Sequence, residues 1–443
     1  FGTVEYVTSA LFDRNSYHLA GLTLGGPLLF NKAKTAPLVG FLLATEFSYT
    51  GVGRPYATPV YKLKDDVLAD LQANPITPTA TGLGTIRRAE LIGADAFETI
   101  PTRLNVASTV FRATGNINIK TGKKTNLVLG GRAFYTNGRN GSFFHSLMNY
   151  NKNGASEQRD LSGYVRFTQQ FGSSENSLIQ NAFYTIQADY TINNFKNYDA
   201  DHGDNIFRYG HVGQFETGRI GLYGFGTDEK TGITAWRKLL DLDTGIAFTP
   251  SQYNPILANY TSSYYNLVNS GLIANNIANL NNIQQGGGLL NGQTPYDVYG
   301  LFGNVGAVQS GYGYSQNEQY RITASTNFDI KGHSLIAGLE YEQRFDRSFG
   351  VAAASLWTLM RNLQNDHMKE LDLENPLLIY RDGVFQDTIT YNRALDLTKP
   401  RTFDRKLRNA LGWNPTGGDQ RLLDIDNITP DQFQQYGGLS LFS

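Results

Sequence analysis

Cysteine is absent from the 443 residues of this chain. Its absence excludes disulfide bridges and thiol catalysis, and it is compatible with a compartment in which free thiols would be oxidised. An excess of one charge is also lacking, because 38 lysines and arginines stand against 39 aspartates and glutamates, for a net charge of -1. Without a basic field nucleic acid has no electrostatic reason to bind, so we exclude nucleic-acid partners.

Long apolar runs are missing too. No window approaches the ~18 consecutive apolar residues of a transmembrane helix, so only strands could carry this chain across a membrane. The first residue is Phe1, and no signal peptide precedes the strand-like segment that starts there. We therefore expect that processing or truncation has removed the start of the protein.

Charged residues are scarce at 17%, whereas aromatic residues reach 12% and glycines number 47. Soluble globular domains carry roughly 25% charged residues. Polarity here comes from Asn, Gln, Thr, Ser and Tyr, which tolerate a wet lumen at low desolvation cost, while a lipid-facing surface suits the apolar remainder. A soluble lectin-like sandwich has a similar composition, so composition leaves both classes open.

Alternation of apolar and polar side chains is clearest between Gln319 and Phe345, where a tight turn at 331–333 separates two alternating runs. Period-two alternation on both sides of a turn predicts a hairpin. We expect the apolar set to face lipid, because an Arg at the bilayer midplane costs about 2 to 4 kcal/mol; this set includes Ala324, Phe328, Leu339 and Tyr341. Polar positions of this hairpin and of two others are our candidates for the lumen: Arg112, Asn116, Arg166, Gln187, Asp189, Arg321, Asp329 and Glu340.

Similar hairpins are predicted at 17–49, 106–135 and 161–193, with a less regular one at 207–248. They bring the expected strand count to about eleven. Short turns within hairpins alternate along the chain with long connections between hairpins, which is typical of outer-membrane barrels. The expected strands of about 12 to 17 residues are also longer than the strands of soluble sheets. The pattern favours an all-β fold, a transmembrane antiparallel β-barrel with long extracellular loops at about 50–105, 250–316 and 350–443.

The long loops contain helical patterns of their own. Apolar residues at helical spacing, two early aspartates and a following Pro75 predict a short helix at 64–72, and a similar pattern occurs at 357–371. The Asn- and Tyr-rich segment 257–283 lies in another long loop. We expect ordered loops with short helices.

Candidate chemistry is sparse. The six histidines fall in different segments without a metal-binding spacing, so we expect surface or turn histidines, no metal and no cofactor. The acidic run 199–204 lacks the spacing of a calcium loop, and the glycine run 286–288 opens no phosphate-binding helix; both are interpreted as loop features. Since no nucleophile, base and oxyanion grouping can be assembled, we predict no enzymatic activity.

Several runs resemble TonB-dependent outer-membrane receptors that carry a carboxypeptidase-regulatory-like N-terminal domain. The resemblance extends through essentially the whole chain and is carried by TLGGPLLFNK at 23–32, PLVGFLLATEFSY at 37–49, KDDVLADLQANPITPT at 64–79, LIQNAFYTIQADYT at 178–191, NPILANYTSSYYNLV at 254–268, GLEYEQRFDRSF at 338–349 and VFQDTITYNR at 384–393. It implies a barrel of about 22 strands around a plug, opened by energy transmitted through TonB. Neither a TonB box nor a plug is in this sequence.

On that resemblance we expect active import of a large or scarce substrate across a Gram-negative outer membrane. Expected partners are TonB, through regions outside this chain, outer-membrane lipid, a surface lipoprotein lid, and a small-molecule, glycan or peptide substrate that the sequence does not identify. A passive porin, a secretion-associated barrel and a secreted adhesin or lectin remain as alternatives. About eleven strands are half of about 22, so we expect residues 1–443 to be the N-terminal half of the barrel, with the plug before Phe1 and further hairpins after Ser443.

Overall fold

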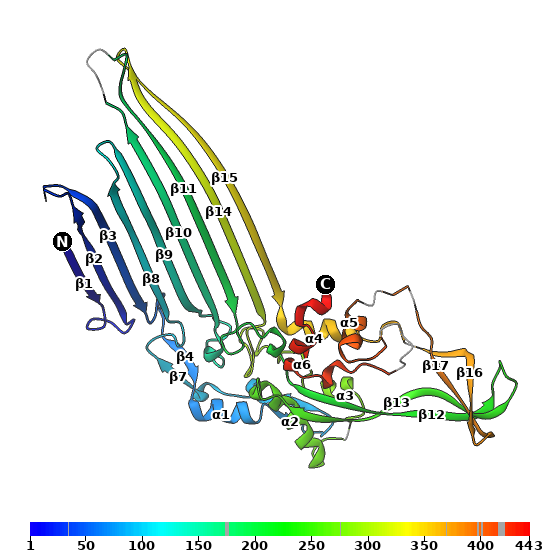
Figure 1. Cartoon of the computed structure of the whole chain (residues 1–443). Coiled ribbons are helices and arrows are strands. Elements are labelled where there is room, and N and C mark those ends of the chain that lie inside the picture. Colours follow the sequence, from blue (N-terminus) through cyan, green and yellow to red (C-terminus); the bar gives the residue numbers. More distant parts are fainter. Residues whose placement is uncertain are drawn as a thin grey trace.

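A computed structural model describes residues 1–33, 35–172, 177–274, 276–368, 370–396, 398–399, 402–414 and 421–443. The fold is mostly β and has two parts, one long sheet and a mixed region of helices, loops and strands at one end of its strands (Figure 1). We call that region the cap; it comprises the described residues of 51–107, 141–153, 199–310 and 353–443.

The long sheet has nine strands in the order β1-β2-β3-β8-β9-β10-β11-β14-β15, and every neighbouring pair is antiparallel. The strands are β1 (Gly2–Thr8), β2 (Tyr17–Phe30), β3 (Pro37–Thr50), β8 (Ser108–Lys120), β9 (Thr125–Asn140), β10 (Gly154–Gln170), β11 (Ile179–Tyr198), β14 (Gly311–Ile330) and β15 (His333–Ala352). The expected large antiparallel sheet is therefore present.

The hairpin of β14 and β15 illustrates why these residues form strands. Ala324 pairs with Leu339 and Thr323 pairs with Glu340, so apolar residues share one face and polar residues the other. Lys331 and Gly332 connect the strands with positive φ values of 47° and 81°. Two positive φ angles belong to the type I′ turn that fits the twist of a hairpin, and glycine adopts one of them without strain. The turn predicted from the sequence is confirmed.

Connections of very different length join the strands. At one end of the sheet, the turn end, neighbouring strands are joined by residues 31–36, 121–124, 171–178 and 331–332. At the opposite end, the loop end, residues 9–16 make the shortest connection and the cap segments make the others. The predicted division into short and long connections therefore separates the two ends of one sheet.

The expectation of about eleven strands in one sheet is wrong by one hairpin. Strands β12 (Gly213–Thr227) and β13 (Thr234–Pro250) pair with each other, but they belong to a four-stranded sheet in the cap, with the order β12-β13-β17-β16. Register shifts after Gly218 and Leu222 interrupt their alternation, so neither face is continuously apolar. The loop expected at about 250–316 is thus part of a longer excursion, 199–310.

The rest of the cap combines short strands and helices. Its further strands are β4 (Val60–Leu63), β5 (Ile76–Pro78), β6 (Thr85–Arg87), β7 (Phe97–Ile100), β16 (Leu371–Arg381) and β17 (Val384–Arg393). Its α-helices are α1 (Asp65–Ala73), α2 (Pro255–Asn269), α3 (Leu280–Gln285), α4 (Leu356–Leu363), α5 (Thr402–Ala410) and α6 (Pro430–Gln435). No helix in the described parts of the chain has the length and apolarity needed to cross a membrane.

Two of these helices test the sequence prediction directly. Helix α1 is confirmed: Asp65 and Asp66 lie in its first turn, and Leu68 and Leu71 are buried. Helix α4 starts where predicted but ends at Leu363, well before 371. Gln364 is extended, with φ −68° and ψ 140°, which ends the helix, and strand β16 starts at Leu371. Lys369, within the predicted helix, lies outside the described residues.

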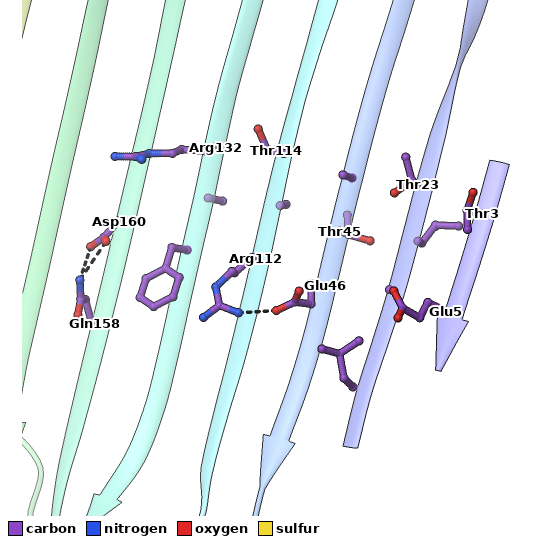
Figure 2. Close-up of a pocket in the computed structure, with 17 residues that line it drawn as sticks. Thr3, Glu5, Thr23, Thr45, Glu46, Arg112, Thr114, Arg132, Gln158 and Asp160 are labelled. Carbon is purple, nitrogen blue, oxygen red and sulfur yellow. Dashed lines mark hydrogen bonds and ion pairs between the residues drawn. The ribbon is translucent and has the colours of Figure 1, made fainter. Parts of the chain in front are cut away.

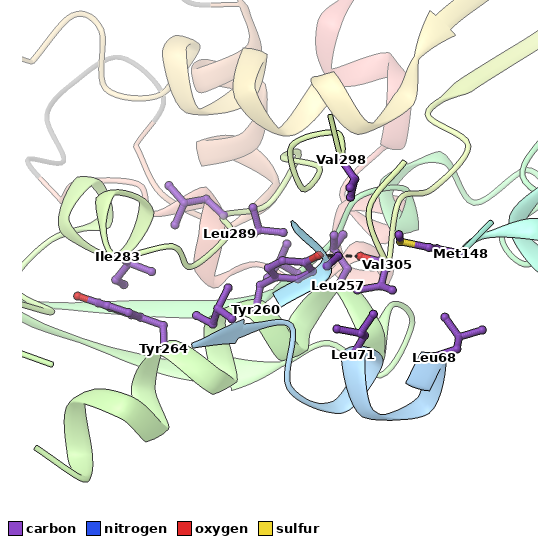
Figure 3. Close-up of a cluster of buried hydrophobic side chains, with 14 of the residues drawn as sticks. Leu68, Leu71, Met148, Leu257, Tyr260, Tyr264, Ile283, Leu289, Val298 and Val305 are labelled. Atoms are coloured by element: carbon purple, nitrogen blue, oxygen red, sulfur yellow. Dashed lines mark hydrogen bonds between the residues drawn. The ribbon is translucent and has the colours of Figure 1, made fainter. Parts of the chain in front are cut away.

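Three clusters of buried hydrophobic side chains hold the cap together, two of them large and a third, small one around Ile389 and Tyr391 in the four-stranded sheet. The first joins α1 and α2 to the 283–305 segment, with Leu71, Leu257 and Tyr260 among its buried side chains (Figure 3). The second joins the 206–209 segment to the chain from 353 onward around Trp357 and Phe433. Each core is assembled from segments that are far apart in the sequence, so the long connections form a folded structure.

Candidate functional site

The eight polar residues predicted from the sequence lie on one face of the nine-stranded sheet. Cross-strand pairs share a face, and the register links Arg112 through Phe134 to Asp160 on β10. On β10, Asp160 shares its face with Arg166, which is paired with Gln187. The same alternation along β8, β11, β14 and β15 places the full set on what we call the polar face: Arg112, Asn116, Arg166, Gln187, Asp189, Arg321, Asp329 and Glu340.

A cavity of about 700 Å³ lies on the polar face over six neighbouring strands, β1, β2, β3, β8, β9 and β10 (Figure 2). Glu46 and Arg112 form an ion pair across β3 and β8. Gln158 donates to both carboxylate oxygens of Asp160 at 3.1 and 2.9 Å. The lining therefore combines charges of both signs with threonine hydroxyls, a surface suited to water or to a polar occupant.

A second polar cluster lies on the same face further along the sheet. The Nε atom of Arg166 donates to Oε1 of Gln187 at 2.5 Å, and Nε2 of Gln187 donates to Asp189 at 2.6 Å. Arg321 approaches Asp189 at 3.6 Å from the neighbouring strand. The structure thus brings four of the predicted residues into one chain of contacts across β10, β11 and β14.

The remaining candidates are more isolated. Asp329 accepts a hydrogen bond from Nδ2 of Asn181 at 2.8 Å, next to a bulge in β11. For Asn116 and Glu340, no side-chain hydrogen bond or ion pair is found among the residues that the structure describes. They share the face without joining either cluster.

Sequence reasoning missed other charged members of the polar face, among them Glu5, Glu46 and Arg132. Arg132 donates through Nε to the hydroxyl of Ser162 at 3.1 Å. The signal was present for Glu46, since it is the only charged residue in the otherwise apolar strand 37–50. A single charge in such a strand points to the polar side of a two-faced sheet.

Over the part of its strands toward the turn end, the opposite face of the sheet is apolar, and nothing in the described chain covers it. Toward the loop end the same face carries two ion pairs, Glu157–Arg159 and Glu318–Arg347. Leu339 is 76% exposed and Ile322 is 53% exposed, although both lie in the middle of long strands. Phe111 on β8 and Val165 on β10 are also exposed. The expected apolar set Ala324, Phe328, Leu339 and Tyr341 lies on this face, opposite to Arg321, Asp329 and Glu340.

The expectation of surface or turn histidines holds only in part, because four of the six are buried, three of these in turns. His145, His202, His211 and His367 are buried in the cap. His202 is in contact with Asn254 at 2.8 Å and His211 with Ser251 at 2.8 Å, and burial lowers the pKa of His211 to about 3. Packing of distant cap segments buries these rings, and no spacing in the sequence signals it. No group of residues able to hold a metal ion is found in the described chain.

Lysine side chains form ion pairs with the acidic run 199–204. Asp204 pairs with Lys196 at 2.6 Å and Asp201 pairs with Lys152. Burial alone would raise the pKa of Asp201, but the Lys152 partner outweighs burial and lowers it. Asp199 accepts from the backbone N–H groups of Asp201 and His202, so these carboxylates stabilise the loop and are not arranged around a cation.

Comparisons with known proteins give no family for this chain. No family model matches it, and no curated protein is close enough in sequence to count as a relative. Its function is therefore argued from its residues and its geometry.

Proposed function

We propose that the nine-stranded sheet is part of the transmembrane β-barrel of a Gram-negative outer-membrane importer of the TonB-dependent kind. The observation that carries the proposal is the contrast between the two faces. One face presents ion pairs and amides to a large open cavity, and the other presents exposed aliphatic and aromatic side chains. A wall between a water-filled lumen and lipid requires this contrast.

The apolar face argues against a soluble protein. Monomeric soluble proteins rarely expose contiguous apolar patches beyond a few hundred Å², and antiparallel sheets normally bury one face against a second layer. Here no second layer covers the apolar side in the described chain, which disfavours an adhesin or lectin sandwich. Strands such as β11 and β14, with 20 residues each, are longer than the ~9 to 11 needed to cross a bilayer.

The difference between the two ends of the sheet supports one orientation of the sheet in the membrane. Outer-membrane barrels keep short turns in the periplasm and long loops outside the cell. The turn end would then be periplasmic and the cap extracellular. The cap at the loop end is folded around hydrophobic cores of its own, and such ordered extracellular loops favour a gated importer over a passive porin.

The two edges of the sheet limit how such a barrel closes. Strands β1 and β15 are the edges, and both run from the turn end to the loop end. A pair between them would be parallel, whereas all other neighbours are antiparallel. An odd number of further strands between the edges makes every pair antiparallel and gives the even total usual for bacterial barrels. Unpaired edges in lipid would cost several kcal/mol per backbone group.

The import function and its partners rest on the resemblance of the sequence to TonB-dependent receptors, with which this geometry is compatible. In this proposal TonB acts through polypeptide outside residues 1–443, and the polar face surrounds the path of a large or scarce small-molecule, glycan or peptide substrate. A surface lipoprotein would close the extracellular side. The residues described here would form the wall and the cap, with no catalytic step.

The lipid-facing assignment can be tested with spin labels, because the chain has no native cysteine. We expect a label at Ile322→Cys, reconstituted in vesicles, to be relaxed by oxygen dissolved in lipid. A matched label at Thr323→Cys should respond to a water-soluble nickel complex. The reverse accessibility would refute the assignment.

The import function requires a separate test in cells. A strain lacking the gene should grow poorly on the scarce nutrient that the protein imports, and the gene should restore growth only where TonB is functional. Restoration without TonB would instead identify a passive porin.

A further inference from the structure

A recessed cavity of about 550 Å³ lies within the cap, where two excursions of the chain meet. The 51–107 excursion supplies Thr85 and Arg87 from β6, and the 199–310 excursion supplies Tyr260 from α2 and the segment 284–296. None of the lining residues belongs to the nine-stranded sheet. The cavity is therefore separate from the polar face.

The floor of this cavity is apolar and tightly packed. Ile76, Tyr260 and Leu289 are buried there, and the Tyr260 hydroxyl donates to the carbonyl of Val305 at 2.9 Å (Figure 3 shows Tyr260 and Leu289). A Cβ added to Gly287 would lie 2.1 Å from the Thr85 hydroxyl, so glycine permits the close approach of the two excursions. The floor is preformed.

The walls are lined by amides. Gln284 and Gln285 are exposed, and no hydrogen bond of either side chain is found in the described chain. Gln293 accepts from the backbone N–H of Leu290 at 2.9 Å through Oε1, which orients its amide and leaves its NH₂ group as a donor. Carboxamides both donate and accept, so they match hydroxyl groups, which do the same.

The cavity carries little net charge. Arg87 is the single ionised side chain among the described lining residues, and Glu90 neutralises it at 2.9 Å. The Arg87 guanidinium also lies over the ring of Tyr296 at 4.8 Å from its centroid, and this contact positions the ring at the rim. Tyr296 remains 71% exposed. A neutral site with an exposed ring disfavours anions and offers a flat surface to the C–H face of a sugar.

We propose that this cavity binds an uncharged oligosaccharide, with the glutamine amides hydrogen-bonded to its hydroxyls and Tyr296 in contact with one sugar ring. A concave site with an apolar floor and a few oriented polar groups is the usual form of a small-ligand site. The inference rests on the proposed import function only in naming a ligand class for it, since binding to the purified protein requires no transport.

Binding is tested by calorimetry on the full chain in detergent, with neutral hexasaccharides of glucose, xylose and mannose and with a carboxylated oligogalacturonate as probes. We expect at least one neutral probe to bind and the carboxylated probe to give no measurable binding. Tyr296→Ala and Gln293→Leu should each weaken binding about three- to tenfold, as expected for the loss of one aromatic or hydrogen-bonding contact. Tyr380→Ala, at an exposed tyrosine on β16, is the matched control and should bind like the wild type.

Each contrary result is decisive. Failure of all neutral probes, or binding of an uncharged peptide instead of any sugar, would overturn the ligand class. Equal affinity of the Tyr296→Ala variant and the control would overturn the location, provided that tryptophan fluorescence shows both to be folded. Loss of import in cells with binding intact would count against the proposed function and leave this site standing.

Discussion

The nine-stranded sheet and the cap are stabilised in different ways. Among the described hydrophobic residues that are buried, only Ala155 belongs to the nine strands; all others lie in the cap. The sheet is held by hydrogen bonds between neighbouring strands and leaves both faces to its surroundings. The cap buries many of its apolar side chains in cores, although its β12–β13 hairpin leaves others, such as Ile220, Phe225 and Trp236, exposed. The stability of the sheet therefore depends on the medium that surrounds its two faces, whereas the cap is stabilised by cores of its own.

The two regions also differ in how far apart their contacts lie along the chain. Four hairpins of the sheet, β2–β3, β8–β9, β10–β11 and β14–β15, close through short turns. In the cap, Arg361 holds Asp426 at 2.8 Å, and Asp426 accepts from Asn291 at 3.0 Å. The contact between Asn291 and Asp426 joins two excursions separated by the hairpin of β14 and β15, so the cap forms only after distant segments have met.

The largest expected effect is in the second core of the cap. Phe433 is fully buried between Phe207 and Trp357, with ring centroids 5.4 and 5.3 Å away. Phe433→Ala should lower the free energy of unfolding of the cap by about 3 to 5 kcal/mol, because it removes a buried ring and leaves a cavity. The three tryptophans, Trp236, Trp357 and Trp413, all lie in the cap, so their fluorescence during urea titration reports this loss.

Leu339→Ala is the corresponding change in the sheet, at a side chain that the chain itself does not cover. It should change stability in detergent by less than ~1 kcal/mol. Equal losses for Phe433→Ala and Leu339→Ala would contradict the contrast between the two regions.

A charge on the apolar face should come next in size. Ile322→Arg places a guanidinium toward lipid and should cost about 2 to 4 kcal/mol of folding free energy in vesicles. Thr323→Arg adds the same group to the polar face, opposite Glu340, and should cost much less. Urea titration of folding into vesicles measures both; a similar penalty at the two positions would show that the sheet is not a two-sided wall.

Stability of the cap should fall in mild acid. The ordinary pKa of a histidine is 6.5, and burial lowers that of His211 to about 3, with Asp431 acting weakly in the other direction. Above pH 6.5 the ring is neutral in both states. Between pH 6.5 and 3 only the unfolded chain takes up the proton, so the unfolding free energy falls by up to about 1.4 kcal/mol per pH unit.

This dependence is measured by following cap fluorescence in urea at several pH values. His211→Gln should reduce the slope in this window, whereas His333→Gln, at the exposed turn end, should keep it. An unchanged slope in His211→Gln would mean that other groups account for the acid sensitivity.

The smallest effect is expected on the polar face. The ion pair of Glu46 and Arg112 is partly exposed, so water screens it. Glu46→Gln should lower sheet stability by less than ~1 kcal/mol, measured by urea titration in vesicles, as expected for exposed pairs. A loss as large as that of Ile322→Arg would show that the polar face is a dry interface.

The sequence by itself determined the local elements. Alternation in 319–345, the turn at Lys331 and Gly332, and helix α1 all follow from residues that are neighbours along the chain, and each is present in the structure. The shared face of the eight polar candidates follows from the same period of two, because cross-strand partners inherit the alternation of each strand. The sequence also divided short connections from long ones.

Only the tertiary structure decided how the long connections fold and pack against one another. No pattern in the sequence indicated that β12 and β13 leave the main sheet, that four histidines become buried, or that Arg87 and Tyr296 meet beside three glutamines. The physical reason is that these outcomes depend on packing between excursions far apart in the chain. Such packing has no repeating period, whereas a strand reveals itself through the two faces that every second residue shares.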